Sequence, residues 1–332
     1  MKTRIPEIDI VKGLSVYLVV LGHLLDLIGD PAPAINLCHI AAFFFVSGFL
    51  LHGSLERHGI GGVLRSKTRC LLIPYLIWSA VSLIANLGLS FIHGEAMTLQ
   101  AFAAEFTDVF LRGRSVWFLI QLLFAHYVLL MCKKPANKDS VFWITSIVIY
   151  MLLCLILPDD WFQFILFKRL YGFFLAGYAV AASPDLRGKF MKPTAARVLV
   201  AVSCTYPLLV WLFFRSGLYA QMDAGALKPL AVLLGMITGA VGVLLIFTAA
   251  TFLRNRRTGN ALAVIGQYSI DIYVMHMFLV KFLPVHTLVA RLPVAVTYVF
   301  MFIYAAMIVA VIYCLSAYVL RRSKLYCMSV GR

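Results

Sequence analysis

Long apolar runs follow one another along almost the whole chain, separated by short polar stretches. A helix that crosses a bilayer needs about 20 mostly apolar residues. Ten windows meet or nearly meet that length, and they predict ten membrane-spanning helices. The windows are 8–28, 36–53, 71–92, 115–132, 141–158, 164–182, 196–214, 228–253, 262–283 and 293–320.

Hydrophobic residues make up 62% of the 332 residues, and charged residues only 13%. This composition is too apolar for a soluble domain and indicates a polytopic membrane protein. The stretches between the windows are short, which leaves no room for a separate soluble domain. The sequence therefore predicts an all-α fold, in which residues 1–332 form one integral-membrane domain with a bundle of about ten transmembrane helices.

The formal net charge of +15 follows an alternating pattern along the chain. Lys and Arg gather in every second connecting stretch, whereas the other stretches hold few cations and collect Asp and Glu. Because membrane insertion retains positive loops in the cytoplasm, this pattern predicts that both termini are cytoplasmic. The charge needs no nucleic-acid partner, and it suits anionic headgroups of membrane lipid.

The first window differs from a cleaved secretory signal, because Asp9 and Lys12 interrupt it and no small-residue cleavage site follows. We therefore expect a retained first span. The seven cysteines form no CxxC pair, so neither a disulfide framework nor a metal site is expected. Walker, Rossmann and HExxH patterns are absent, which excludes nucleotide hydrolysis and zinc proteolysis.

Three ionisable residues lie on one stripe of the first predicted helix. Lys12 and His23 are eleven residues apart, which places them within about 20° of alignment and about 16 Å apart along the axis. Asp9 precedes Lys12 by three residues, so the two can form an ion pair. Lys12 alone is better explained by snorkelling toward the interface. His23 lies too deep in the window to snorkel easily. A histidine at such a position either hydrogen bonds a neighbouring helix or moves protons.

The ninth window, "IGQYSIDIYVMHMFLV", holds a second polar face. Ser269, Tyr273 and His276 follow one another at i, i+4 and i+7 and therefore share one side of a helix. Measured from Leu262 at 1.5 Å per residue, His276 lies about 21 Å deep, and His23 lies about 22 Å from the start of its own window. The matching depths predict that the two histidines lie at the same level. Asp271 falls off this face and is assigned no role.

Polar residues also lie near the outer ends of two further windows. His39 begins the second window, and Lys168 and Arg169 begin the sixth, where one of the two cations is expected to snorkel. In the same second window Ser47 and Gly48 are best explained by close helix packing. A basic inner entrance and outer histidines suit an anionic donor inside and a hydroxyl outside, as acyl transfer requires. Proton-coupled transport could use the same residues, so the pattern alone leaves both open.

Six segments, in order along nearly the whole chain, resemble the boxes of the acyltransferase 3 family of membrane-bound acyltransferases. They are "RIPEIDIVKGLSVYLVVLGH", "HIAAFFFVSGFLL" in the form seen in members similar to fucose 4-O-acetylases, "RCLLIPYLIW", "WFLIQLL", "YGFFLAGY" and "IGQYSIDIYVMH".

This resemblance implies a ten-helix enzyme of the cell inner membrane that moves an acyl group, usually acetyl, from cytoplasmic acyl-CoA to a carbohydrate hydroxyl. It makes His23 the essential catalytic histidine and Lys12 its basic partner, and it places Arg69 at the phosphates of coenzyme A. Many members carry Arg where this chain has Lys12, and Lys offers only a point charge in place of a bidentate contact.

The leading hypothesis is an O-acyltransferase that acts on a cell-envelope or exported carbohydrate, with acetyl-CoA or another acyl-CoA as donor substrate and no tightly bound cofactor. The acceptor is a carbohydrate or a lipid-linked glycan. The competing hypotheses are an exporter without transferase activity and a structural subunit of an export complex. The absence of visible repeats and paired broken helices favours the enzyme. The candidate residues are His23, Lys12 and Asp9 for catalysis, Arg69, Arg65 and Lys67 for the donor, and His39, Arg169, Ser269, Tyr273, His276 and Trp117 for the acceptor side.

Overall fold

The computed structural model describes residues 5–30, 33–94, 98–133, 139–191, 200, 202–212, 228–282, 289 and 292–331. Every regular element within these ranges is helical, as expected where water cannot satisfy the backbone. The helices are α1 (Pro6–Leu27), α2 (Pro33–Lys67), α3 (Ile73–Ile92), α4 (Leu99–Phe106), α5 (Trp117–Lys133), α6 (Asp139–Ile156), α7 (Phe164–Ala182), α8 (Pro184–Met191), α10 (Tyr206–Val210), α12 (Lys228–Leu253), α13 (Arg257–Gln267), α14 (Ser269–Phe282), α16 (Val294–Tyr318) and α17 (Lys324–Ser329).

The apolar windows located most of the long helices. The helices α1, α3, α5, α6, α7, α12 and α16 begin and end within two residues of the predicted windows. Within the described ranges six helical stretches are long and apolar enough to cross a membrane, or seven if the bent pair α13 and α14 is one span. The number ten and the side of the termini remain predictions. Of the window 196–214, the structure describes only 200 and 202–212.

The predicted helix layout is wrong in three places. The second helix continues past residue 53 to Lys67, so most of the expected cytoplasmic loop is helical, with a kink at Gly59, whose φ is 61°. The loop expected after residue 92 contains α4 and a π-helical segment, Thr107–Leu111. The ninth window is two helices, α13 and α14, which are bent by 80° where Tyr268 separates them.

The chain forms two compact units. Unit 1 comprises Met1–Val46 and Ala179–Leu320, and unit 2 comprises Ser47–Tyr178 and Arg321–Arg332. The single domain expected over 1–332 remains a prediction, and each unit is described by itself.

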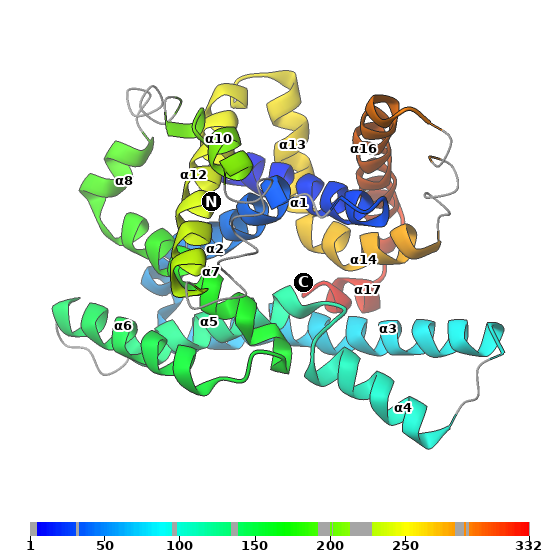
Figure 1. Ribbon diagram of the computed structural model, residues 1–332. Coiled ribbons are helices and arrows are strands. Elements are labelled where there is room, and N and C mark those ends of the chain that lie inside the picture. The colour runs from blue at the N-terminus through cyan, green and yellow to red at the C-terminus, as the bar shows by residue number, and fades with distance from the viewer. Residues whose placement is uncertain are drawn as a thin grey trace. The chain divides into compact units, whose positions relative to one another are not determined.

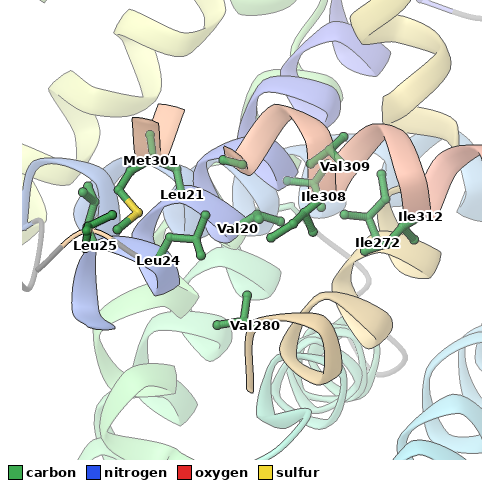
Figure 2. Close-up of a cluster of buried hydrophobic side chains, with 13 residues drawn as sticks. Val20, Leu21, Leu24, Leu25, Ile272, Val280, Met301, Ile308, Val309 and Ile312 are labelled. Atoms are coloured by element: carbon green, nitrogen blue, oxygen red, sulfur yellow. The ribbon is translucent and has the colours of Figure 1, made fainter. Parts of the chain in front are cut away.

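Helix α1 lies at the centre of unit 1, because α12, α13, α14 and α16 all pack against it. Figure 1 shows α13 and α14 leaving one another at a sharp angle beside α1. Figure 2 shows the core that joins α1 to α14 and α16. Its labelled side chains are Val20, Leu21, Leu24, Leu25, Ile272, Val280, Met301, Ile308, Val309 and Ile312. This core fixes α14 alongside the second half of α1.

Unit 2 is held together by close backbone packing and by its C-terminal segment. A Cβ at Gly48 would lie 2.0 Å from the carbonyl oxygen of Phe174, so the expected packing role of this glycine is confirmed. Pro74 lacks the N–H that an α-helix would need, and the preceding residues Thr68–Leu72 form a π-helical turn instead. The Trp78 indole donates to the carbonyl of Ser329 at 3.0 Å, which docks α17 on α3.

Candidate active site

The first half of α1 holds an ion pair that the spacing predicted. Lys12 Nζ lies 3.1 Å from Asp9 Oδ1, and the two side chains are only 24% and 15% exposed. In this largely buried setting each charge needs the other, because an isolated buried charge is costly. A salt bridge at this end of the stripe therefore holds the Lys12 side chain in place.

His23 lies at the exposed end of the same stripe. Its Nδ1 is 3.7 Å from Asp26 Oδ2, and the two side chains are 41% and 43% exposed. Asp26 follows His23 at the i, i+3 spacing, which is the signal in the sequence that predicts this neighbour. The carboxylate gives one ring nitrogen of His23 a polar partner beside solvent.

His276 on α14 is buried and rigidly oriented. Its Nδ1 lies 2.6 Å from the carbonyl oxygen of Tyr273 and 3.2 Å from that of Ile272. Because a carbonyl oxygen can only accept, Nδ1 carries the proton and donates, and in the neutral ring Nε2 is a bare acceptor. This Nε2 is buried and has no hydrogen-bond partner within the described part of the chain.

Two of the predicted residues from distant parts of the chain meet here. The ring centroids of His23 and His276 are 5.2 Å apart, with the planes tilted by 30°. The Tyr273 ring lies 6.0 Å from the His276 ring. The expected level of the two histidines is therefore right, but the depth measured along a straight helix from Leu262 is not valid, because the chain turns at Tyr268.

His39 on α2 completes a cluster of three histidines with His23 and His276, which we call the histidine cluster. Its Nδ1 donates to the carbonyl of Ile35 at 2.6 Å, and the side chain is 3% exposed. A charge on His23 acts electrostatically on both other rings, and a charge on His39 acts on His276. Within the described residues no group of three or more metal-ligating side chains is placed to hold a metal ion.

Ser269 and Asp271 lie at the start of α14. Ser269 begins α14, so the face it shares with Tyr273 and His276 runs along one uninterrupted helix. Asp271 is 1% exposed and lies in the first turn of α14, where the positive end of the helix dipole stabilises a carboxylate.

A second ion pair, missed by sequence reasoning, joins the start of α1 to the turn after α12. Arg254 Nη1 lies 2.5 Å from Glu7 Oε1, and the Glu7 side chain is only 6% exposed, whereas that of Arg254 is 53% exposed. No local rule could have found this pair, because 247 residues separate its members. It ties α1 to the loop that leads into α13.

The predicted donor residues all belong to unit 2. Arg65 and Lys67 end α2, and Arg69 lies in the π-helical turn that follows. Arg65 and Arg69 are exposed, and Lys67 is half-buried and acts electrostatically on the buried His126. Lys67 and its neighbours therefore form a basic segment at the junction of α2 and α3.

Two predicted acceptor-side residues also belong to unit 2. Trp117 begins α5 and packs edge-on against Phe118, and Arg169 lies in the first turns of α7. Of the two adjacent cations on α7, it is Lys168 that reaches back to the loop, where Nζ lies 2.7 Å from Asp159 Oδ1. The structure thus groups Asp9, Lys12, His23, His39, Ser269, Tyr273 and His276 in unit 1 and the remaining candidates in unit 2.

Comparison with known proteins gives the family. Residues 5–318 match the family described as an acyltransferase domain, Acyl_transf_3. The nodulation protein NolL of Sinorhizobium fredii (strain NBRC 101917 / NGR234) is 34% identical over 136 residues, which cover 37% of this chain and 37% of that protein. The match thus spans little more than a third of that relative's length, and no solved structure matches the chain. The chain belongs to the acyltransferase 3 family, and its several apolar helices indicate a multi-pass membrane protein.

Proposed function

We propose that this acyltransferase moves an acyl group, acetyl by preference, from cytoplasmic acyl-CoA to a hydroxyl of a cell-envelope or exported carbohydrate. The protein would act in the cell inner membrane with both termini cytoplasmic, as the distribution of Lys and Arg predicts. The observation that carries the proposal is the approach of His23 and His276 to 5.2 Å in a membrane protein of this family.

Acyl transfer to oxygen needs what the histidine cluster can supply. A hydroxyl is a poor nucleophile until a base takes its proton, and an imidazole is the side chain best matched to that task near neutral pH. The hydroxyl oxygen bonds to the thioester carbon, the carbon–sulfur bond breaks, and the proton ends on the coenzyme A thiolate. His23 is the most exposed ring of the cluster, so it is the ring that an acceptor reaches first.

The cations have a separate task in the proposal. Lys12, held by Asp9, offers a fixed positive charge to the donor, and Arg65, Lys67 and Arg69 offer others for the phosphates of coenzyme A. No tightly bound cofactor takes part. The acceptor side is assigned to His39, Tyr273 and Ser269 in unit 1 and to Trp117 and Arg169 in unit 2.

Transfer of label from acetyl-CoA to glycan in inverted membrane vesicles tests this function. Wild type is compared with His23→Ala and with His93→Ala, which removes an exposed histidine at the end of α3. We expect labelled glycan with wild type and His93→Ala, and a loss of about 10²- to 10⁴-fold with His23→Ala, the range typical when an acid–base cluster loses one of its members. No label with wild type and adequate acceptor would favour an exporter or a structural subunit instead.

A further inference from the structure

The rings of the histidine cluster are not held in the same way. His23 has a carboxylate neighbour and a partly exposed side chain. His276 is 1% exposed, and its own helix fixes both its orientation and its tautomer through Nδ1. The cluster therefore contains one ring that solvent and substrate can reach and one ring whose single free atom is a buried acceptor.

The position of that acceptor follows from the hydrogen bond of the other nitrogen. Nδ1 of His276 points back to the carbonyls of Ile272 and Tyr273, so Nε2, on the far side of the ring, projects away from its own helix. Helix α1 packs on α14, and the His23 ring lies against the His276 ring. A buried acceptor without a donor is unfavourable, and a bound hydroxyl would remove that cost by donating to it.

From this geometry we propose that His276 Nε2 is the atom that takes the proton from the acceptor hydroxyl, while His23 contacts the same reacting centre from the exposed side. This assignment rests on the proposed acyl transfer and says which ring performs its first proton step. As the oxygen bonds to the acyl carbon, its proton passes to His276 Nε2. When the carbon–sulfur bond breaks, the sulfur leaves with the electron pair, and Nε2 returns the proton to it. No other reactant is needed.

Hydrogen bonding to the helix is not by itself a sign of catalysis, and the chain provides a matched comparison. His126 on α5 is also fully buried, bonds the carbonyl four residues before it at 2.7 Å, and has an unpartnered Nε2. Its ring, however, packs against Phe174 at 4.8 Å, whereas the His276 ring packs against another imidazole. His126 therefore controls for the loss of a buried, helix-bonded histidine.

Two substitutions separate the base from a mere hydrogen-bond acceptor. His276→Asn keeps a donor near the position of Nδ1 and removes Nε2, and His276→Gln places an amide near Nε2 that can accept a hydrogen bond but cannot take a proton. With purified full-length protein in lipid vesicles, acetyl-CoA and glycan acceptor, we expect both variants to lower kcat by 10²-fold or more and to leave the KM for acetyl-CoA unchanged. His126→Asn should retain transfer.

Chemical rescue tests the role of His276 directly, because added base would not restore transfer if the residue were only structural. His276→Gly opens a space for free imidazole, and added imidazole should restore transfer in proportion to its concentration. With the His276→Asn variant, hydroxylamine should accept the acyl group of acetyl-CoA at close to the wild-type rate, because its neutral nitrogen attacks without prior deprotonation.

The outcomes separate this assignment from the proposed function. Transfer within tenfold of wild type in His276→Gln would overturn the assignment alone. So would an inactive His276→Gly that imidazole does not rescue together with an inactive His276→Asn that hydroxylamine does not rescue. A wild-type protein that transfers nothing would overturn both.

Discussion

The Cα of Gly13 on α1 faces the carbonyl of Leu262 on α13 so closely that a Cβ there would lie 2.1 Å from the oxygen. The contact is reciprocal, because a Cβ at Gly266 would lie 2.0 Å from the carbonyl oxygen of Asp9. Small residues let two helix backbones approach in a membrane, where packing replaces the hydrophobic effect. This crossing holds the end of α13 against the backbone of Asp9 and Gly13, and so sets where α14 begins relative to α1.

Gly13→Ala should prevent this crossing. The added methyl group meets backbone atoms that cannot rotate away, so we expect a loss of stability at or above the upper end of the 1–3 kcal/mol typical of overpacking. Gly88→Ala on α3 is the control, because nothing lies within 4 Å of a Cβ there; it should be neutral or slightly stabilising. Thermal unfolding of the purified proteins in detergent measures both, and equal midpoints would contradict the role of the crossing.

The pair formed by Glu7 and Arg254 should contribute more than an exposed salt bridge. Arg254→Gln leaves a buried carboxylate without its cation, and we expect a loss of about 1–3 kcal/mol, limited by the partial exposure of the arginine. The double variant Glu7→Gln/Arg254→Gln should recover part of that loss. Denaturant unfolding in mixed micelles gives the coupling free energy from a double-mutant cycle. Arg256→Gln, an exposed neighbour, serves as control, and additive single effects would argue against the pair.

Lys12 should act on the donor through its charge. Loss of a charge-assisted contact is worth about 1.5–3 kcal/mol, so Lys12→Gln should raise the KM for acetyl-CoA by roughly 10- to 100-fold. Lys12→Arg should keep the KM at or below the wild-type value, because arginine adds a bidentate contact to phosphate. Initial rates at varied acetyl-CoA concentration measure this, with Arg187→Gln on α8 as an exposed control. A fall in kcat with an unchanged KM for acetyl-CoA would contradict a role of Lys12 in donor binding.

The C-terminal segment should protect Cys70 from modification. The thiol donates to the carbonyl of Gly331 at 2.9 Å, and a Cβ on that glycine would lie 2.5 Å from Cys70 Cα. Gly331→Val should therefore release the segment and speed maleimide labelling of Cys70 about tenfold. The segment would lose the hydrogen bonds from the Cys70 thiol and the Trp78 indole, each worth about 0.5–1.5 kcal/mol. Peptide mass spectrometry follows the reaction.

The matched control for this experiment is Gly94→Val. Gly94 has the same φ of 75° as Gly331, but nothing lies within 4 Å of a Cβ at that position. The two variants thus share the backbone strain and differ in the contact. Equal labelling of Cys70 in both would show that strain alone, and not the docking of the segment, controls access to the thiol.

The apolar windows predicted helix positions well because length and hydrophobicity are local properties. The ends of α7 and α12 coincide with their windows. The break at Tyr268 escaped prediction because no proline marks it, and its cause lies in another part of the chain. Helix α13 has to cross α1 at Gly13, whereas α14 has to pack along α1 through Ile272. One straight helix cannot do both.

Residue chemistry predicted the histidine cluster better than geometry did. His23, His39 and His276 were singled out because an ionisable residue in an apolar helix needs a reason to be there. The tautomers of His39 and His276 could not be predicted, because they depend on backbone carbonyls that the fold brings to the rings. Asp26 could have been found from its spacing to His23, but the partner of Glu7 could not.

The distribution of the histidine cluster along the chain has a consequence for biosynthesis. His23 and His39 enter the membrane with the first two helices, whereas His276 is made only after most of the chain has been translated. A nascent or prematurely released chain thus carries the reachable imidazole without the buried acceptor. By the division of roles proposed for these rings, such a chain would not consume acyl-CoA, and catalytic competence would arise only when the ribosome has nearly finished and α14 has joined α1.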